Sequence, residues 1–177
     1  MAFIDLKKPL AKLPLNFPAR KRFIPRFKTP KFKQPFKKPN VALFIDGPNM
    51  IRKEFSLNLR ELRERLSKYG RLSIGKVFLN QYASEKLIEA VSNEGMEVHI
   101  ALGDPEQKTD VDVIVAVHAM EAVFNKDIDV IALATRDADF LALIQKAKEK
   151  GKTVVLITSK KGMGISLKHA ADHVEFF

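Results

Sequence analysis

Four aspartates stand where their carboxylates can do chemistry together. Asp46 lies in FIDGPN, Asp112 in KTDVDV, and Asp137 and Asp139 in TRDADF. Each one follows an apolar, strand-like run or opens a helix-like one. A doubly wound α/β fold gathers such positions at a single edge of its sheet. Because carboxylates crowded there either bind a divalent metal or repel one another, the sequence predicts a metal-dependent site.

Two of these aspartates also have plain structural explanations. Asp46 precedes a Gly-Pro-Asn turn, but its carboxylate leaves a fully apolar strand. This favours a functional role, with Asn49 as a second ligand or orienting group. For Asp112 the two interpretations are equally good. Thr109 can be the N-cap of the helix and Asp112 its N3 residue, and a carboxylate that caps a helix can still reach a metal.

Asp137 and Asp139 lie on either side of an alanine at a strand-to-helix turn. Acidic residues are common at helix starts. Two of them after a buried strand, with Asp46 on a neighbouring strand, favour function instead. Asp137 is the better candidate for metal binding, and Asp139 orients it or binds through water. We therefore expect Asp46, Asp112 and Asp137 to be the metal ligands.

A second group of residues suits phosphate. Lys160 and Lys161 precede a glycine-rich turn, GMG, and Ser166 follows it near a helix start. GMGISL does not complete GxGxxG, so no nucleotide cofactor is expected. His118, in VIVAVHAM, has no HxxH or HxxxH partner. We expect it to be a hydrogen-bonded core residue rather than a zinc ligand.

The first forty residues differ from the remainder of the chain in charge. Residues 1–40 hold twelve Lys or Arg residues, one acidic residue and seven of the nine prolines. The chain has 31 basic and 21 acidic residues in total, so residues 41–177 hold 19 and 20. The basic residues expected to matter most are Arg20, Lys21, Arg22, Arg26, Lys28, Lys31, Lys33, Lys37 and Lys38.

This basic tail is expected to bind RNA. Dense proline disfavours helix and sheet, so the segment should be extended. Lys and Arg neutralise phosphates, and the interleaved Phe23, Phe27, Phe32 and Phe36 can stack on unpaired bases. A solubilising linker is the alternative, but a linker gains nothing from exposed Phe. Binding to a membrane surface is a weaker alternative, because the proline spacing forbids an amphipathic helix.

Composition narrows the class of protein further. The chain has no cysteine, which excludes disulfides, thiolate metal sites and cysteine nucleophiles. No apolar run approaches the ~18 residues of a membrane span, and the N-terminus lacks the apolar core of a secretory signal. A soluble, cytoplasmic protein is expected.

The elements that would position these residues alternate between strand and helix through residues 41–177. Continuous apolar runs predict strands at 41–45, 72–82, 96–102, 129–135 and 153–158. Helical periodicity and caps predict helices at 57–66, 84–93, 110–124 and 138–149. A short helix and an edge strand at 173–177 end the chain. Strict alternation predicts a three-layer, doubly wound parallel sheet.

FIDGPNM, the KTDVD of Lys108 to Asp112 and the DADF of Asp137 to Phe140 resemble the NYN domains, a branch of the PIN-like nucleases. The archaeal and bacterial members are the most similar, and the resemblance covers residues 41–177. It implies strand order 3-2-1-4-5, a site for Mg²⁺ or Mn²⁺, and cleavage of RNA. The four aspartates match the family's acidic pattern, and Asn49 matches its asparagine.

Two departures from the family pattern are visible. His118 stands where many members carry an acid, and Thr135 and Arg136 stand where many have Ser-Gly. Arg136 can hold an RNA phosphate or substitute for metal charge. The resemblance favours a metal-dependent endoribonuclease. The alternative is a non-catalytic RNA-binding component of the ribosome or another ribonucleoprotein, anchored by the tail. A Toprim-type DNA enzyme is a weaker alternative, because the Toprim motif requires a glutamate after the first strand and this chain has Asp46 there.

Overall fold

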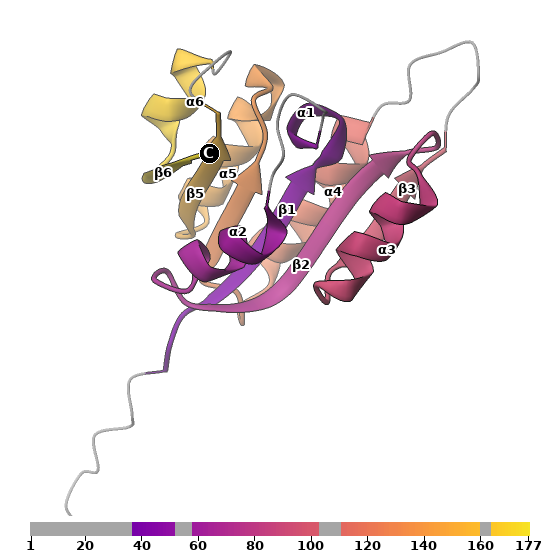
Figure 1. Ribbon diagram of the computed structural model, residues 1–177. Coiled ribbons are helices and arrows are strands. Elements are labelled where there is room, and N and C mark those ends of the chain that lie inside the picture. The colour runs from indigo at the N-terminus through magenta and orange to yellow at the C-terminus, as the bar shows by residue number, and fades with distance from the viewer. Residues whose placement is uncertain (1–36, 52–57, 103–110, 160–163) are drawn as a thin grey trace, which may run out of the picture. The chain divides into compact units, whose positions relative to one another are not determined.

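The computed structural model describes residues 37–51, 58–102, 111–159 and 164–177, in which strands alternate with helices (Figure 1). The strands are β1 (Asn40–Asp46), β2 (Arg71–Asn80), β3 (Glu97–Ala101), β4 (Val130–Ala134), β5 (Thr153–Thr158) and β6 (His173–Phe176). The helices are α1 (Gly47–Met50), α2 (Leu59–Leu66), α3 (Glu85–Asn93), α4 (Val111–Phe124), α5 (Leu141–Glu149) and α6 (Ile165–Ala170). A 3-10 turn, η1 (Ala138–Phe140), leads into α5.

The described strands form one sheet in the order β3-β2-β1-β4-β5-β6, and each neighbouring pair is parallel. β1 is central, with Ile45 opposite Val77 of β2 and Ala134 of β4. The strand order reverses between β1 and β4. Ligands of open α/β sheets bind outside the carboxyl ends of the strands at such a reversal. The carboxyl ends of β1 and β4 are therefore where a site is expected.

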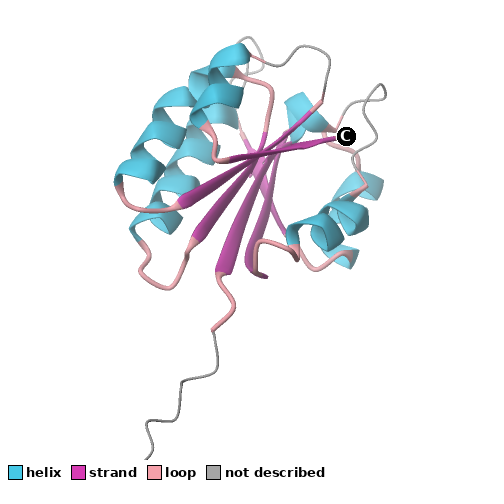
Figure 2. Cartoon of the chain, turned by 90° about the vertical axis from the view of Figure 1, so that its left-hand side faces the viewer, coloured by secondary structure: helices cyan, strands magenta, loops and turns pink. Residues whose placement is uncertain are grey.

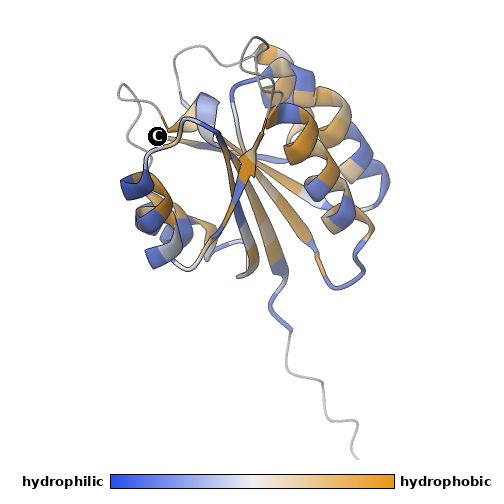
Figure 3. Cartoon of the chain, turned by 90° about the vertical axis from the view of Figure 1, so that its right-hand side faces the viewer, coloured by the Kyte–Doolittle hydropathy of each residue, from blue (hydrophilic) through white to orange (hydrophobic). Residues whose placement is uncertain are grey.

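Alternate residues of the buried strands face two separate hydrophobic cores. Phe44, Ile131 and Leu133 pack under α4, α5 and α6 on one face. Leu43 and Ile45 pack under α1, α2 and α3 on the other. Figure 2 shows helices on both sides of the sheet, and Figure 3 shows the hydrophobic colouring of the strands between them. Every residue of β1 is buried, so the strand that ends at Asp46 is fixed on both faces.

Helix starts and ends follow local sequence signals. Asn58 accepts hydrogen bonds from the backbone of Arg60 and Glu61 at the start of α2. Ser84, the predicted N-cap, accepts from the backbone N–H of Leu87. Gly95 follows α3 with a φ of 72°, a conformation that favours glycine. These caps set the point at which each helix leaves the sheet.

The structure confirms the predicted doubly wound parallel sheet, and β6 is the edge strand predicted at 173–177, which extends the order 3-2-1-4-5. Two local predictions need correction. The Gly-Pro-Asn segment was expected to be a turn, but it forms α1, capped by Asp46 and with Pro48 in its first turn. The helix expected at 138–149 begins with η1 and becomes α-helical at Leu141.

Some predicted features lie outside the described residues. Among the tail cations, Lys37 and Lys38 are described, and both are exposed. The others are not, nor are Lys160, Lys161 and Thr109. Within the described residues, no helix is both long enough and apolar enough to cross a membrane.

Candidate active site at the carboxyl edge of the sheet

Asp46 lies at the carboxyl edge of the sheet and is fully buried, with none of its surface exposed. One carboxylate oxygen, Oδ2, accepts from Asn49 Nδ2 at 2.6 Å and from Thr135 Oγ1 at 2.9 Å. The other, Oδ1, accepts from the backbone N–H of Asn49 at 3.3 Å. A carboxylate offers about four acceptor positions, so Oδ1 keeps room for one more partner. The carboxylate is held at three points and has one oxygen only partly used.

The environment of Asp46 favours its protonated form. Burial raises the pKa of Asp46 above its ordinary value, hydrogen bonds from Asn49 and Thr135 oppose the rise, and the negative charge of Asp137 adds to it. A buried carboxylate with a raised pKa and a second carboxylate nearby is typical of a site that takes up a cation.

Thr135 connects the two strand ends. Its fully buried hydroxyl donates to Asp46 and accepts from the backbone N–H of Asp137 at 3.1 Å. Asp137 is half-buried, and its Oδ1 accepts from the backbone N–H of Asp139 at 3.0 Å. The predicted residues Asp46, Asp137 and Asp139 are thus joined in a short chain of hydrogen bonds through Thr135.

Arg136 ties the same segment to α1. Its Nε donates to the backbone carbonyl of Asn49 at 3.1 Å. The guanidinium therefore lies beside the acidic chain, and its Nε is used to hold the end of β4 against the end of β1. Among the predicted site residues, Asn49 and Arg136 both help to position Asp46.

Asp112 and Asp139 line one cavity of about 520 Å³ between α4 and α5. Its other lining residues are all apolar: Val113, Ala116, Met120, Phe140, Ala142 and Leu143. Asp112 lies in the first turn of α4, as predicted, and is half-buried. The structure thus brings Asp46 near Asp137, and Asp112 to the same cavity as Asp139.

The oxygen ligands at this edge suit a hard divalent cation. Within the ranges that the structure covers, no group of three His, Cys, Asp or Glu side chains is close enough to hold a metal. Mg²⁺ is commonly bound by one or two carboxylates with waters and substrate phosphates completing its shell. Asp46 and Asp137 provide two such carboxylates. Asp46 Oδ1, which accepts one hydrogen bond, is the oxygen that such an ion would bind.

Ser166 lies in α6 and is exposed. The residue that precedes this helix, Gly164, is close to the acidic segment, since a Cβ at Gly164 would lie 3.5 Å from Ala138 Cβ. Gly164, at the start of α6, therefore lies against the turn that carries Asp137 and Asp139. The two lysines predicted to act with Ser166 are outside the described residues.

His118 belongs to a different cluster. Its Nδ1 lies 3.3 Å from Lys76 Nζ and 3.5 Å from Glu121 Oε2, and its ring packs against those of Phe78 and His99. Burial lowers the pKa of His118, and the nearby positive charges of Lys76 and His99 lower it further. The expected hydrogen-bonding and packing contacts are present, but the His118 side chain is 24% exposed, so the residue lies at the margin of the core rather than within it.

Thr135 is not among the site residues predicted from the sequence. Ile45 is the register partner of Ala134, so the residues that follow them, Asp46 and Thr135, are neighbours across the two strands. A threonine after a buried strand is an ordinary strand-end residue, and register cannot be read from one sequence. The family pattern, which often has serine here, is the signal that points to a hydroxyl at this position.

Comparison with known proteins agrees with the architecture. The uncharacterized protein MJ0482 of Methanocaldococcus jannaschii is 55% identical over 134 residues, which cover 76% of this chain and 53% of that protein. This chain therefore spans about half the length of that relative. A crystal structure of a protein of unknown function, VPA0982 from Vibrio parahaemolyticus, superposes with a TM-score of 0.70 at 19% identity, over 81% of this chain and 96% of the other. That likeness concerns the fold.

The family model of the NYN domain matches residues 40–177, from the first residue of β1 to the last residue of the chain. The match includes all four aspartates, Asn49 and the β1–β4 strand ends that carry the hydrogen-bonded chain. NYN domains are PIN-like, RNA-associated nuclease domains, and such nucleases typically use divalent metals. This chain belongs to the NYN domain family.

Proposed function

We propose that this protein binds RNA and cleaves its phosphodiester bonds as a divalent-metal-dependent endoribonuclease. The observation that carries the proposal is the buried Asp46 carboxylate, held by Asn49 and Thr135 beside Asp137 at the strand reversal. Burying a carboxylate whose pKa is raised destabilises the fold unless a bound cation compensates its negative charge. Members of the NYN family are RNA-associated nuclease domains, and in such nucleases carboxylates of this kind bind a divalent metal.

Each residue has a role in this proposal. Asp46 and Asp137 hold Mg²⁺ or Mn²⁺, which when bound supplies the Lewis acidity for phosphodiester hydrolysis. Thr135 and Asn49 orient Asp46. Asp112 and Asp139 line the neighbouring cavity and complete the acidic rim. Arg136, Lys160, Lys161 and Ser166 are assigned to the phosphates of the substrate, and the basic tail supplies affinity for RNA.

A non-catalytic RNA-binding role is the second candidate. One observation favours it: no three-acid metal group is present in the described part of the chain. In that case the fold is a platform, and the tail anchors the protein to rRNA in the ribosome or to another large ribonucleoprotein.

The two candidates are separated by cleavage of the RNA that co-purifies with the full-length protein. With Mn²⁺, wild type should cut this RNA and Asp137→Asn should not, while Asp137→Asn should bind it as well as wild type or better, because a charge that repels phosphate is lost. Asp127→Asn is the matched control. Asp127 is an exposed aspartate in the turn before β4, at the opposite edge of the sheet. If wild type and Asp137→Asn are equally inert and the protein sediments with ribosomes, the scaffold role replaces the nuclease.

A further inference from the structure

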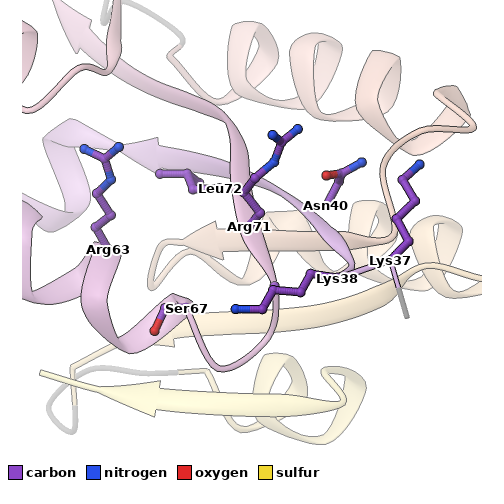
Figure 4. A pocket seen from close by; sticks show the side chains of 8 residues that line it. Lys37, Lys38, Asn40, Arg63, Ser67, Arg71 and Leu72 are labelled. Atoms are coloured by element: carbon purple, nitrogen blue, oxygen red, sulfur yellow. The ribbon is translucent and has the colours of Figure 1, made fainter. Parts of the chain in front are cut away.

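A second cavity, of about 630 Å³, opens at the amino edge of the sheet, where β1 and β2 begin. Figure 4 shows that its side chains arrive from three segments. Lys37, Lys38 and Asn40 come from the chain that enters β1, Arg63 and Ser67 from α2 and its end, and Arg71 and Leu72 from the start of β2. We call this cavity the amino-edge pocket.

The amino-edge pocket carries concentrated positive charge. Among its lining residues, Lys37, Lys38, Arg63 and Arg71 are cationic, and none of its lining residues is acidic. Within the described residues, none of the four cations forms an ion pair with a carboxylate. Glu94 pairs through its carboxylate with Arg60 at 3.3 Å, and its backbone carbonyl accepts from Arg63 Nη1 at 3.0 Å. The Asp129 carboxylate accepts from the backbone N–H of Asn40 at 2.8 Å and pairs with none of the four cations. The four positive charges of the pocket are therefore not neutralised by any residue that lines it.

The walls of the amino-edge pocket are fixed to one another. The backbone N–H of Arg71 donates to the carbonyl of Pro39 at 2.8 Å. Gly70 permits this contact, since a Cβ there would collide with that carbonyl. Asn40 is almost fully buried, and its side chain donates to the Asp127 carbonyl at 2.7 Å and accepts from Ser73 Oγ at 3.0 Å. The cations thus project from a rigid frame.

We propose that the amino-edge pocket binds the phosphodiester backbone of RNA. Lys and Arg without acidic partners are the groups that neutralise phosphates, and backbone contacts of this kind position a nucleic acid without reading its sequence. Two of the cations, Lys37 and Lys38, continue the run of basic residues that precedes the domain.

This inference rests on the proposed RNA-binding function and adds a location to it. β1 runs from the pocket at Asn40 to the acidic site at Asp46, a span of roughly 20 Å for a strand that rises about 3.3 Å per residue. The pocket thus lies at the opposite edge of the sheet from the acids and acts as an anchor rather than as part of the cleavage site.

The test uses the full-length protein, a labelled single-stranded RNA and EDTA, so that binding is measured without cleavage. Arg63→Gln/Arg71→Gln should reduce the slope of log Kd against log[KCl] by about 1.4, since each lost phosphate contact contributes about 0.7. Lys146→Gln/Lys150→Gln removes the same number of charges from α5 and the residue that follows it, on the opposite face of the sheet from α2, and should keep the wild-type slope. Arg63→Lys/Arg71→Lys keeps the charge and should also retain it.

The proposal is overturned if the α5 control reduces the slope as much as the pocket variant, or if the pocket variant behaves as wild type. Failure of the nuclease proposal is seen separately. If wild type does not cut RNA with Mn²⁺ but the pocket variant still lowers the salt slope, the nuclease proposal is rejected and the proposal for the amino-edge pocket is retained.

Discussion

Thr135 offers the sharpest test of how the acidic site is held together. Its Oγ1 donates to Asp46 and accepts from the Asp137 backbone N–H, and the residue is fully buried. Thr135→Val keeps the shape of the side chain and removes both bonds. Water cannot replace them without a rearrangement, because the position has no exposed surface.

The expected loss follows from the two bonds. A hydrogen bond to a charged group contributes roughly 1.5–3 kcal/mol, and a bond between neutral groups roughly 0.5–1.5 kcal/mol. Thr135→Val should therefore lower the free energy of unfolding by about 2–4 kcal/mol at neutral pH. Thr135→Ser, which retains the hydroxyl, should lose much less.

The assay is chemical denaturation of wild type and variants in EDTA, with the midpoint and slope fitted separately. Thr158→Val is the matched control, because Thr158 is also fully buried at the end of a neighbouring strand, but its Oγ1 has no hydrogen-bond partner among the described residues. Removing an unsatisfied buried hydroxyl should leave stability unchanged or raise it. The reasoning is refuted if Thr135→Val lies within about 0.5 kcal/mol of wild type, or if Thr158→Val is destabilised to the same extent.

Four further predictions concern the pH dependence of stability, the metal, the tail and the packing of α1. Because the pKa of Asp46 is raised in the folded state, the free energy of unfolding without metal should fall as pH rises above the ordinary Asp range, and Asp46→Asn should lessen that fall. Mn²⁺ at a hundred times its Kd should stabilise wild type by about 2.7 kcal/mol and leave the stability of Asp46→Asn unchanged. Equal thermal shifts in wild type and Asp46→Asn would count against the metal site. Deleting residues 1–36 removes ten Lys and Arg residues and should lower the salt slope of RNA binding by up to about 7 with the melting temperature kept, whereas an unchanged slope would exclude the tail as the main RNA contact. Gly47→Ala should lower the free energy of unfolding by about 1–3 kcal/mol, since its Cβ would collide with the Phe78 carbonyl and the Leu79 side chain. In the same denaturation assay Gly164→Ala, whose Cβ makes only ordinary contacts, should have nearly wild-type stability.

The strands, and the aspartates that follow them, could be predicted because their signals are local. Five consecutive apolar residues before Asp46 identify a central parallel strand, and the strand end then determines where its carboxylate lies. The same holds for Asp137 after β4. Helix starts at Ser84 and helix ends at Gly95 depend on residues within one turn.

The parts that the sequence could not predict depend on register and on packing between distant segments. The bond from Thr135 to Asp46 joins residues 89 positions apart and requires the pairing of Ile45 with Ala134. The amino-edge pocket requires Arg63, from α2, to stand beside residues that enter β1. A short helix at Gly47–Met50 forms because Asp46 caps it, although Gly-Pro-Asn is typical of a turn.

The two ends of β1 carry charges of opposite sign, and this has a consequence for the rate of encounter with a polyanion. The cations of the amino-edge pocket lie at the Asn40 end of β1, and Asp46 and Asp137 lie at its other end, so these side chains contribute an electric dipole component along the central strand. Such a field turns an approaching polyanion before contact and raises the association rate at low ionic strength. Because added salt screens the field over about 10 Å at 0.1 M, orientation before contact weakens as ionic strength rises, while the short-range contacts of the bound state change less. Association and dissociation rates should therefore differ in their dependence on salt.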